Sequence, residues 1–397
     1  MQTKLLINLN PLRPPLTGIG YYTKNIVKEC LQRNIEFVGI KNGKLFSQPE
    51  INGLIASLED HSNATLHSSS SSSSSSKKKM VELLRSFPGI YAVKHFLVSL
   101  RAKKILDSLA KQGFIYFEPS FVPMKFKGKI ITTIHDLSFI THPEFHPIER
   151  VNFLTKMVKN TVSVSKHIIV DSDFIHRELL ENYSVTESQV STVYLGVEDK
   201  FRTYSKQKTA PILDKLKLTE NEFILSVATL EPRKNLAKLV GAYRDLSDEI
   251  KNKYPLVLVG PSGWKNSTLF DSIQDLVANG NIVVTGYLSD IELNYIYSSA
   301  AVFVYPSIYE GFGLPIIEAM ASGTAVITSH SGATAEVAGD SALLIDPNSE
   351  KAITEGIASI LSDSNLRLSL QKKAVERASF FTWKKCVDDI LSITQKL

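Results

Sequence analysis

The chain has 397 residues, of which 43% are hydrophobic and 21% are charged. This ordinary globular composition is rich enough to bury the cores of two or three domains. The formal net charge of +5 suits phosphates, nucleotides or an anionic membrane surface, and it is too small an excess to indicate nucleic-acid binding.

The two cysteines, Cys30 and Cys386, are too few and too far apart for a disulfide framework or a metal-ligand cluster. We expect both to be reduced thiols. The first apolar run, Leu5–Leu9, is too short for a signal peptide and is typical of a buried strand. No stretch approaches the length of a membrane span, so the sequence predicts a cytoplasmic protein that at most contacts the inner membrane.

Short apolar runs alternate with amphipathic segments in two series, the pattern of buried parallel strands joined by helices. Expected strands are Leu5–Leu9, Phe37–Ile40, Phe114–Phe117, Ile130–Ile134, His167–Val170 and Gln189–Val193, then Phe223–Ala228, Leu256–Val259, Ile282–Thr285, Val302–Tyr305, Ala325–Thr328 and Ala342–Ile345. Expected helices are Tyr21–Gln32, Leu97–Ala110, Glu149–Val164 and Asp173–Asn182, then Asn235–Leu246, Thr268–Asn279, Ser289–Ser299, Pro315–Ala321, Ala333–Ala338 and Ser349–Ser362. Two such series predict an α/β protein with two doubly wound, Rossmann-like domains facing a central cleft.

The segment between Phe201 and Pro211 is polar and lacks periodicity, as a linker does. The predicted domains are therefore residues 1–205 and 206–375, and residues 376–397 form a C-terminal helix that packs back toward the first domain. Nine serines, Ser68–Ser76, followed by three lysines predict a disordered loop over residues 67–79. We interpret it as a tolerated insertion; the alternative is a basic flap attracted to anionic lipid or a phosphorylated acceptor.

The segment Tyr305–Gly323 is the richest in candidate site residues. A predicted strand leads into a loop that carries Glu310, and Pro315 suits the first turn of the next helix. Ligands bind beyond the carboxyl ends of parallel strands, where this loop lies. Gly311 and Gly313 let backbone amides approach an anion, and the helix N-terminus adds partial positive charge.

The two carboxylates of this segment have different predicted tasks. Glu310 precedes the helix and can accept hydrogen bonds from sugar hydroxyls, whereas Glu318 can reach a ribose diol. The alternative for Glu318 is structural, because acidic residues are favoured near helix N-termini.

The run Glu310-Gly-Phe-Gly-Leu-Pro-Ile-Ile-Glu318-Ala-Met-Ala-Ser-Gly resembles the E-x7-E signature of retaining GT-B glycosyltransferases, the glycogen-synthase-like family four. The resemblance continues through Ser329–Val337 to Asp346-Pro347. It implies that Glu310 contacts the donor sugar and Glu318 the ribose. It also implies that residues 206–375 bind the nucleotide sugar and that residues 1–205 bind the acceptor. The sugar and the diphosphate of the donor are then held by the loop amides of Gly311, Phe312, Gly313 and Leu314.

A second strand-to-helix junction carries two cations, Arg233 and Lys234. Fixed cations stabilise the charge that develops on a departing nucleoside diphosphate. The family places an Arg and a Lys on the donor phosphates, often with a wider spacing between the two residues. The alternative interpretation of Arg233 and Lys234 is a solvated, charged helix start. The resemblance also implies that Gly260 lies near the donor phosphates and that Tyr287 and Leu288 lie near the base. The alternative for Gly260 is structural, because glycine commonly serves a tight turn.

The first half resembles the acceptor domain of the same family more loosely. Gly18, Gly20 and Tyr21 lie between the first strand and the first helix, in a loop that the family places at the cleft, although a G-x-G alone is a weak signal. His135 and Asp136 follow a strand. A histidine there is often only structural, and the resemblance places His135 near the reacting sugar.

The run Asp171-Ser172-Asp173 also follows a strand. One interpretation is a D-x-D motif that holds a divalent cation. The other, which we favour, is a strand-to-helix junction at the cleft in which Ser172 caps the helix. We therefore expect a metal-independent enzyme without a cofactor.

Two stretches look most like bacterial surface-polysaccharide mannosyltransferases, namely His135–Glu144 and Thr229–Asn235. They imply GDP-mannose as donor and a polyprenol-linked oligosaccharide of O-antigen or capsule biosynthesis as acceptor. UDP-glucose and UDP-galactose remain alternative donors. An epimerase, a phosphorylase or a non-catalytic binding protein on this fold is less favoured. The basic, apolar stretch Tyr91–Leu106 is expected to pack on the sheet, and the alternative is contact with an anionic membrane.

Overall fold

The computed structural model describes residues 4–14, 16–64, 89–229, 231–260 and 272–397, and the chain divides into two compact units. Unit 1 comprises residues 1–195 with 383–397, and unit 2 comprises residues 196–382. The predicted loop over residues 67–79 lies outside the described residues, as does the first part of the helix expected at Thr268–Asn279.

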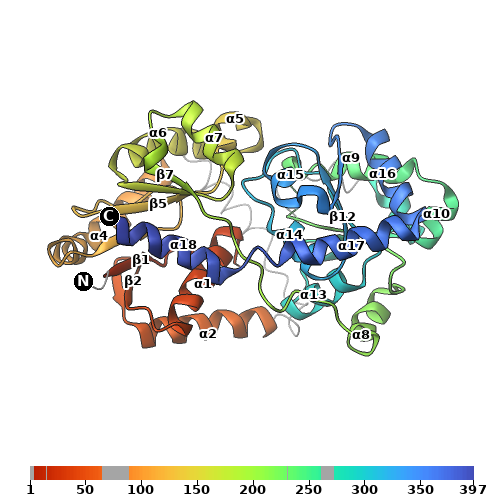
Figure 1. The fold of residues 1–397 in the computed structure, drawn as a ribbon, viewed down its shortest axis with the longest axis horizontal. Helices are drawn as coiled ribbons and strands as arrows, with labels where there is room; N and C mark the ends of the chain where they lie inside the picture. Colours follow the sequence, from red (N-terminus) through yellow and green to blue (C-terminus); the bar gives the residue numbers. More distant parts are fainter. Residues whose placement is uncertain (1–3, 15, 65–88, 230, 261–271) are drawn as a thin grey trace. The chain divides into compact units, whose positions relative to one another are not determined.

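Unit 1 is built on a seven-stranded sheet with the order β3-β2-β1-β4-β5-β6-β7, in which only β3 runs antiparallel to its neighbour (Figure 1). Its strands are β1 (Leu5–Asn8), β2 (Phe37–Lys41), β3 (Lys44–Phe46), β4 (Ile115–Glu118), β5 (Ile130–Ile134), β6 (His167–Val170) and β7 (Val190–Thr192). Its helices are α1 (Gly18–Gln32), α2 (Gln48–Ala64), α4 (Ile90–Lys111), α5 (Ser138–Thr141), α6 (Ile148–Val164), α7 (Asp173–Asn182) and α18 (Trp383–Lys396), with short 3₁₀ turns at Pro143–Phe145 and Glu187–Gln189.

Unit 2 is built on a six-stranded parallel sheet with the order β10-β9-β8-β11-β12-β13. Its strands are β8 (Ile224–Val227), β9 (Leu256–Val259), β10 (Ile282–Gly286), β11 (Val302–Tyr305), β12 (Ala325–Ser329) and β13 (Leu343–Ile345). Its helices are α8 (Lys206–Leu216), α9 (Leu236–Arg244), α10 (Asp248–Lys253), α12 (Gln274–Ala278), α13 (Asp290–Ser299), α14 (Leu314–Ala321), α15 (Gly332–Ala338), α16 (Glu350–Ser362) and α17 (Ser364–Ala378), with 3₁₀ turns at Pro232–Lys234 and Gly339–Ser341.

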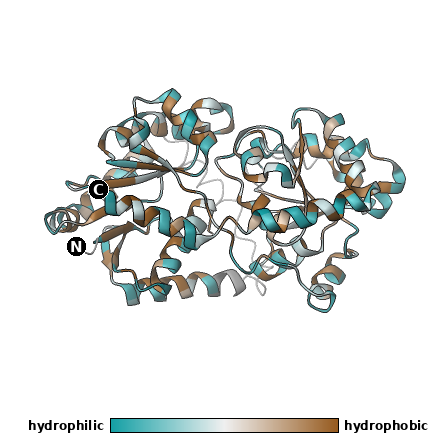
Figure 2. Cartoon of the chain, in the orientation of Figure 1, coloured by the Kyte–Doolittle hydropathy of each residue, from teal (hydrophilic) through white to brown (hydrophobic). Residues whose placement is uncertain are grey.

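The central strands are largely apolar because helices cover both faces of a parallel sheet, and the polar residues Asn8 and Glu118 come at the carboxyl ends of β1 and β4. Every residue of β1, β4, β5, β9 and β11 is buried, and the strands accordingly stand out as apolar in Figure 2. The order of each sheet reverses once, between β1 and β4 in unit 1 and between β8 and β11 in unit 2. Such a reversal leaves a crevice beyond the carboxyl ends of the two strands, which is where ligands bind in this class of fold.

The predicted linker between Phe201 and Pro211 is wrong. Phe201 packs on Tyr297, with ring centroids 5.7 Å apart, and Tyr204 packs on Tyr295 at 4.9 Å. Both rings contact α13, so the segment belongs to unit 2, and α8 begins at Lys206. The unit boundary therefore lies ten residues earlier than predicted, after Leu195.

The C-terminal residues 376–397 do not form the single helix that the sequence predicts. Helix α17 ends at Ala378, and α18 begins at Trp383. Helix α18 buries one stripe, formed by Trp383, Cys386, Val387, Ile390 and Ile393, and packs against α1 within unit 1. The short edge strand β3 and the helices α2, α5, α8, α10 and α17 were not anticipated.

Candidate active site

The reversal point of the unit 2 sheet brings together the residues that the sequence predicts for the donor. Arg233 and Lys234 lie in the 3₁₀ turn after β8, and Glu310 lies in the loop after β11. These two strands are neighbours in the sheet. Two predicted cations, 77 and 76 residues before the predicted carboxylate in the chain, are therefore in direct contact with it.

Glu310 accepts a hydrogen bond from each of four side chains although it is only 8% exposed. Its Oε2 atom accepts from Arg233 Nη1 at 2.6 Å. Its Oε1 atom accepts from Lys234 Nζ at 2.5 Å, from Tyr305 Oη at 2.9 Å and from Ser307 Oγ at 2.6 Å. The carboxylate is thus neutralised by two cations and held by two neutral hydroxyls.

The charge states follow from these contacts. Burial alone would raise the pKa of Glu310, but Arg233 and Lys234 outweigh it and lower that pKa to about 2. Burial and the neighbouring Arg233 lower the pKa of Lys234, while Glu310 opposes this shift. The cluster is therefore a buried set of ion pairs, an arrangement that is stable only when every charge keeps a partner.

Backbone contacts join the two loops that carry this cluster. Ile308 N donates to Arg233 O at 2.9 Å, and Ser307 Oγ lies 3.0 Å from the same oxygen. Ser329 Oγ at the end of β12 donates to Ser307 O at 2.5 Å. The site is consequently built on fixed backbone rather than on loose loops.

The glycine loop leads into α14 as predicted. Gly313 is the N-cap of that helix and has a φ of +110°, which favours glycine. Phe312 is buried and packs on Phe381 with ring centroids 5.6 Å apart, so its ring belongs to the core of unit 2. The amides at this helix start, including those of Gly311 and Leu314, suit an anionic group.

Glu318 lies one turn further along α14 and is half-buried. Its Oε2 atom accepts a hydrogen bond of 3.0 Å from Tyr297 Oη. Burial raises its pKa to about 7 despite this bond. Glu318 therefore differs sharply from Glu310 in electrostatic environment, as two carboxylates with separate tasks should.

Three further donor candidates lie at the ends of β9 and β10. Gly260 has a φ of +142°, and a Cβ atom there would lie 2.0 Å from Ala228 O, so close backbone packing requires glycine. Its amide donates to Gly286 O at 2.9 Å. Tyr287 is 47% exposed, whereas Leu288 is buried, so the Leu288 side chain does not face a ligand.

Unit 1 has a second polar cluster at its own reversal point. Asn8, Glu118, His135 and Asp171 close or follow β1, β4, β5 and β6, which are consecutive in the sheet. Asn8 Nδ2 and Tyr116 Oη each donate to Glu118 Oε2 at 2.7 Å. Ser120 N donates to Glu118 Oε1 at 3.1 Å. Glu118 is 1% exposed, and burial raises its pKa to about 8.

Both ring nitrogens of His135 are occupied in this conformation. Nδ1 lies 2.6 Å from Asp171 Oδ2, and Nε2 lies 2.8 Å from the Pro119 carbonyl oxygen. Burial lowers the pKa of His135, but Asp171 and the two hydrogen bonds outweigh it, so the net shift is upward. A carbonyl accepts but cannot donate, so Nε2 carries a proton here. The ring is thus fixed between strands and has no nitrogen left for a ligand.

The neighbouring polar residues make hydrogen bonds at the starts of two helices. Asp136 Oδ1 accepts from Ser138 N at 3.1 Å and from Ser138 Oγ at 2.7 Å at the start of α5. Ser172 is fully buried, and its side chain accepts from Ile175 N, which confirms the capping interpretation. In the described part of the chain, no group of three or more His, Cys, Asp or Glu side chains is arranged to hold a metal ion.

The predicted loop at Gly18, Gly20 and Tyr21 is wrong, because α1 already begins at Gly18. Tyr21 N donates to Thr17 O at 2.9 Å, which makes Thr17 the N-cap. Gly20 packs closely, since a Cβ atom there would lie 2.9 Å from the Leu16 side chain. Gly18 and Gly20 therefore lie in the first turn of a helix instead of in a glycine loop.

Five residues with evident roles in these clusters were missed: Asn8, Glu118, Tyr297, Tyr305 and Ser307. All except Tyr297 lie at or just after the carboxyl ends of predicted strands. A search for polar residues at the ends of apolar strands would have found these four. Tyr297 sits within α13, and nothing local distinguishes it from a core aromatic residue.

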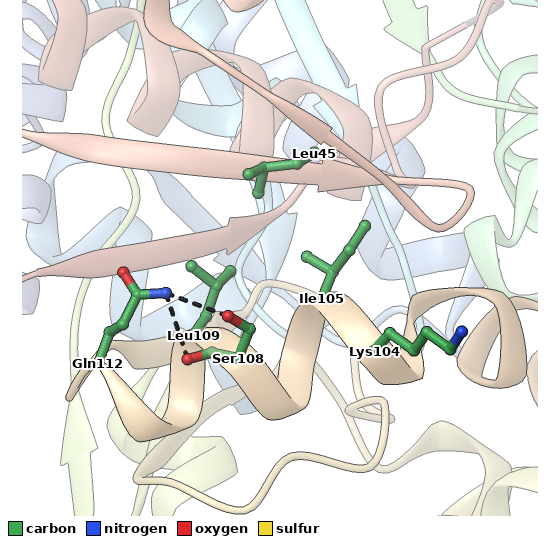
Figure 3. Close-up of a pocket in the computed structure, with 6 residues that line it drawn as sticks. All are labelled: Leu45, Lys104, Ile105, Ser108, Leu109 and Gln112. Carbon is green, nitrogen blue, oxygen red and sulfur yellow. Dashed lines mark hydrogen bonds between the residues drawn. The ribbon is translucent and has the colours of Figure 1, made fainter.

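A pocket of 310 Å³ lies elsewhere in unit 1, between α4 and β3 (Figure 3). Leu45 of β3 faces Ile105 and Leu109 of α4 across it, and Lys104 lies at its border. None of its lining residues is a predicted site residue.

Known proteins match most of the chain. Residues 210–377 match the family described as glycosyl transferases group 1. The chain is 32% identical to the O-antigen chain mannosyltransferase B of Escherichia coli over 390 residues, which cover 98% of each chain.

Two solved structures share the fold. A glycosyltransferase from Rickettsia africae superposes with a TM-score of 0.69 at 20% identity, covering 100% of this chain and 98% of that one. The Anabaena protein Alr3699/HepE, solved with UDP and glucose, superposes with a TM-score of 0.66 at 14% identity and covers 100% of both chains. The predicted GT-B class is confirmed. With a relative 32% identical across 98% of its length, the chain belongs to the group 1 glycosyltransferases.

Proposed function

We propose that this glycosyltransferase transfers mannose from GDP-mannose, with retained anomeric configuration, to a hydroxyl of a lipid-linked oligosaccharide in bacterial O-antigen or capsule biosynthesis. The observation that carries the donor part of this proposal is the contact of Glu310 with Arg233 and Lys234 at the reversal point of the unit 2 sheet. The mannose part rests on the name of the E. coli relative.

The proposed chemistry uses this chain's own cations. The bond between the anomeric carbon and the leaving phosphate oxygen breaks, and a bond to the acceptor oxygen forms on the same face of the sugar. The acceptor proton passes to an oxygen of the leaving diphosphate. Arg233, Lys234 and the amides before α14 stabilise the charge that develops there, so the mechanism requires neither a metal ion nor a protein base.

The remaining residues bind the two substrates in this proposal. Glu310 accepts hydrogen bonds from the donor sugar, Glu318 binds the ribose, and the backbone near Tyr287 and Leu288 contacts the base. Unit 1 binds the acceptor near His135 and Asp136. Because both His135 nitrogens are occupied, we assign His135 the task of holding the strand-end backbone in place rather than that of a proton carrier.

Helix α4 supports peripheral contact with the cytoplasmic face of the membrane, where a lipid-linked acceptor would be met. None of the helices in the described residues is long and apolar enough to span a bilayer. The inner face of α4 packs on the sheet through Ala102, Leu106 and Leu109. Its outer face exposes Val93, Phe96, Leu97 and Leu100 at helical spacing, followed by Arg101, Lys103, Lys104 and Lys111. Apolar residues beside cations suit an anionic lipid surface.

A thermal-shift screen of the full chain with GDP, UDP, ADP and dTDP tests the donor site. Binding to the folded state raises the unfolding temperature, and GDP is expected to raise it most. Stabilisation by UDP alone would replace GDP-mannose with a UDP-sugar, and stabilisation by no nucleotide would refute the proposed donor site. A transfer assay with GDP-mannose and a polyprenol-linked acceptor then separates a transferase from a binding protein.

A further inference from the structure

The two cations proposed to bind the donor diphosphate already have anionic partners within unit 2. Arg233 contacts Glu310 through Nη1 at 2.6 Å and Glu231 through Nε at 3.3 Å. Lys234 is 8% exposed and contacts Glu310 at 2.5 Å. The same carboxylate already neutralises both cations, so a diphosphate that engages them competes with Glu310 for their charge. This competition favours an exchange of partners on binding.

We propose that Glu310 is an internal counter-ion. It pairs with Arg233 and Lys234 in the ligand-free protein, and both cations leave it for the donor diphosphate when the donor binds. This inference rests on the proposed function, because it assumes that the donor phosphates bind at these cations. Once the cations turn to the phosphates, the carboxylate oxygens that they held become available to the hydroxyls of the donor sugar. Phosphate binding and sugar recognition are thereby coupled through one side chain.

The neutral partners of Glu310 explain how it stays in place during the exchange. Tyr305 Oη and Ser307 Oγ both donate to Oε1, and both residues are only 1% exposed. Ser307 is fixed in turn by Ser329 Oγ at its carbonyl. Loss of the cations therefore leaves two hydrogen bonds on Oε1 and frees Oε2, which faces only Arg233 among the contacts shown above. Tyr305 and Ser307 are positioning residues in this scheme.

The exchange also determines which anions bind. A buried charge without a partner is strongly unfavourable, so the cations release Glu310 only to a ligand that supplies at least equal negative charge at close range. A nucleoside diphosphate meets this condition with two linked phosphates. A singly charged anion gains little over the carboxylate already present, so the counter-ion protects the site from small anions.

The substitution Glu310→Gln should strengthen the binding of a diphosphate, although it changes a residue of the proposed donor site. In Glu310→Gln the cations lose their carboxylate, and a diphosphate relieves an uncompensated charge without displacing anything. Isothermal titration with GDP, and with inorganic pyrophosphate as a probe without base or sugar, should show Kd values lower by roughly tenfold than in the wild type. Transfer activity should be lost in the same variant, because the sugar contact is removed.

A second variant covers the case in which Glu310→Gln fails to fold. Glu231 is partly exposed and pairs only with Arg233 in the contacts shown here, so Glu231→Gln should fold and tighten pyrophosphate binding about two- to threefold, in line with a weaker, longer ion pair. Glu350→Gln is the matched control, because it removes an ion pair with Lys238 elsewhere in unit 2. Its Kd values should equal those of the wild type.

Two results would overturn the inference in distinguishable ways. If GDP binds the wild type but Glu310→Gln and Glu231→Gln bind GDP and pyrophosphate no more tightly, Glu310 is not a displaced counter-ion and the proposed donor site survives. If neither the wild type nor any variant binds a nucleotide or pyrophosphate, the donor site itself is wrong.

Discussion

The hydroxyl of Tyr297 donates a hydrogen bond of 3.0 Å to the Oε2 atom of Glu318, joining α13 to the middle of α14. Burial raises the pKa of this carboxyl to about 7, and the Tyr297 bond opposes the shift. Glu318 is therefore half protonated near neutral pH, and its ability to accept hydrogen bonds from a ribose diol changes in this range.

The affinity for GDP-mannose should rise with pH. The Glu318 carboxyl is about one tenth ionised at pH 6 and about nine tenths ionised at pH 8 when its pKa is near 7. Because the carboxylate is the better acceptor, the Kd measured by titration should fall roughly fivefold between these values. In Glu318→Gln the pH dependence should disappear. Tyr297→Phe should move the midpoint to higher pH, and an unchanged midpoint would contradict the coupling of these two residues.

Substitution of Glu310 should abolish transfer without unfolding the chain. We expect Glu310→Gln to lower kcat by about a thousandfold, the size of effect seen when a preorganised polar contact at a reacting group is lost. The rate is measured with GDP-mannose and the lipid-linked acceptor, with thermal unfolding as the check on folding. Glu350→Gln should keep the wild-type rate. Retention of full activity in folded Glu310→Gln would favour a binding protein over an enzyme.

Glu118 should make the protein less stable as pH rises. Its folded pKa of about 8 lies above the ordinary value of 4.5, so the folded state keeps a proton that the unfolded state releases. The free energy of unfolding should therefore fall as pH rises from about 4.5 to about 8, by at most about 1.4 kcal/mol per pH unit from this group. Urea unfolding of the full chain at pH 6, 7 and 8 measures the slope. The upward pKa shifts of His135 and Asp171 act in the same direction.

Glu118→Gln isolates the contribution of that one group. The amide cannot titrate, so the loss of stability between pH 6 and pH 8 should be smaller than in the wild type. Equal slopes in the two proteins would show that Glu118 is ionised throughout this range. Glu59→Gln is the control, because it removes a surface ion pair with Lys28 in the same unit and should leave the slope unchanged.

The outer face of α4 should decide membrane association. Phe96 and Leu100 are 64% and 56% exposed, and replacing both with serine removes the two most exposed apolar side chains of this face. Co-sedimentation with phosphatidylglycerol vesicles should fall by at least about tenfold, since each buried apolar side chain contributes about 1.5–3 kcal/mol. Leu368→Ser is the matched control, because Leu368 is 62% exposed on α17 of unit 2. Equal losses in both variants would point to non-specific adsorption.

The strands of both sheets were predicted closely, because residues buried on both faces leave continuous apolar runs. Strands β5, β6, β9 and β11 have the predicted bounds, and others differ by one or two residues. Helix starts were less accurate. The expected start of α1 at Tyr21 overlooked the Thr17 cap, and α8 was taken for a linker because its short buried face, Thr209, Ile212 and Leu213, is surrounded by polar residues.

Sequence alone singled out Glu310, Arg233 and Lys234 as candidate donor-site residues, because they follow strands and match a specific family pattern. It also determined the fold class, through the alternation of apolar strands and amphipathic helices. Only the tertiary structure decided which charges meet. Strand order placed β8 beside β11, so Glu310 contacts both cations, and placed β1 beside β4, so Asn8 contacts Glu118. Such pairings depend on which strands, distant in the chain, are neighbours in the sheet. The local periodicity of the sequence does not determine the order of the strands.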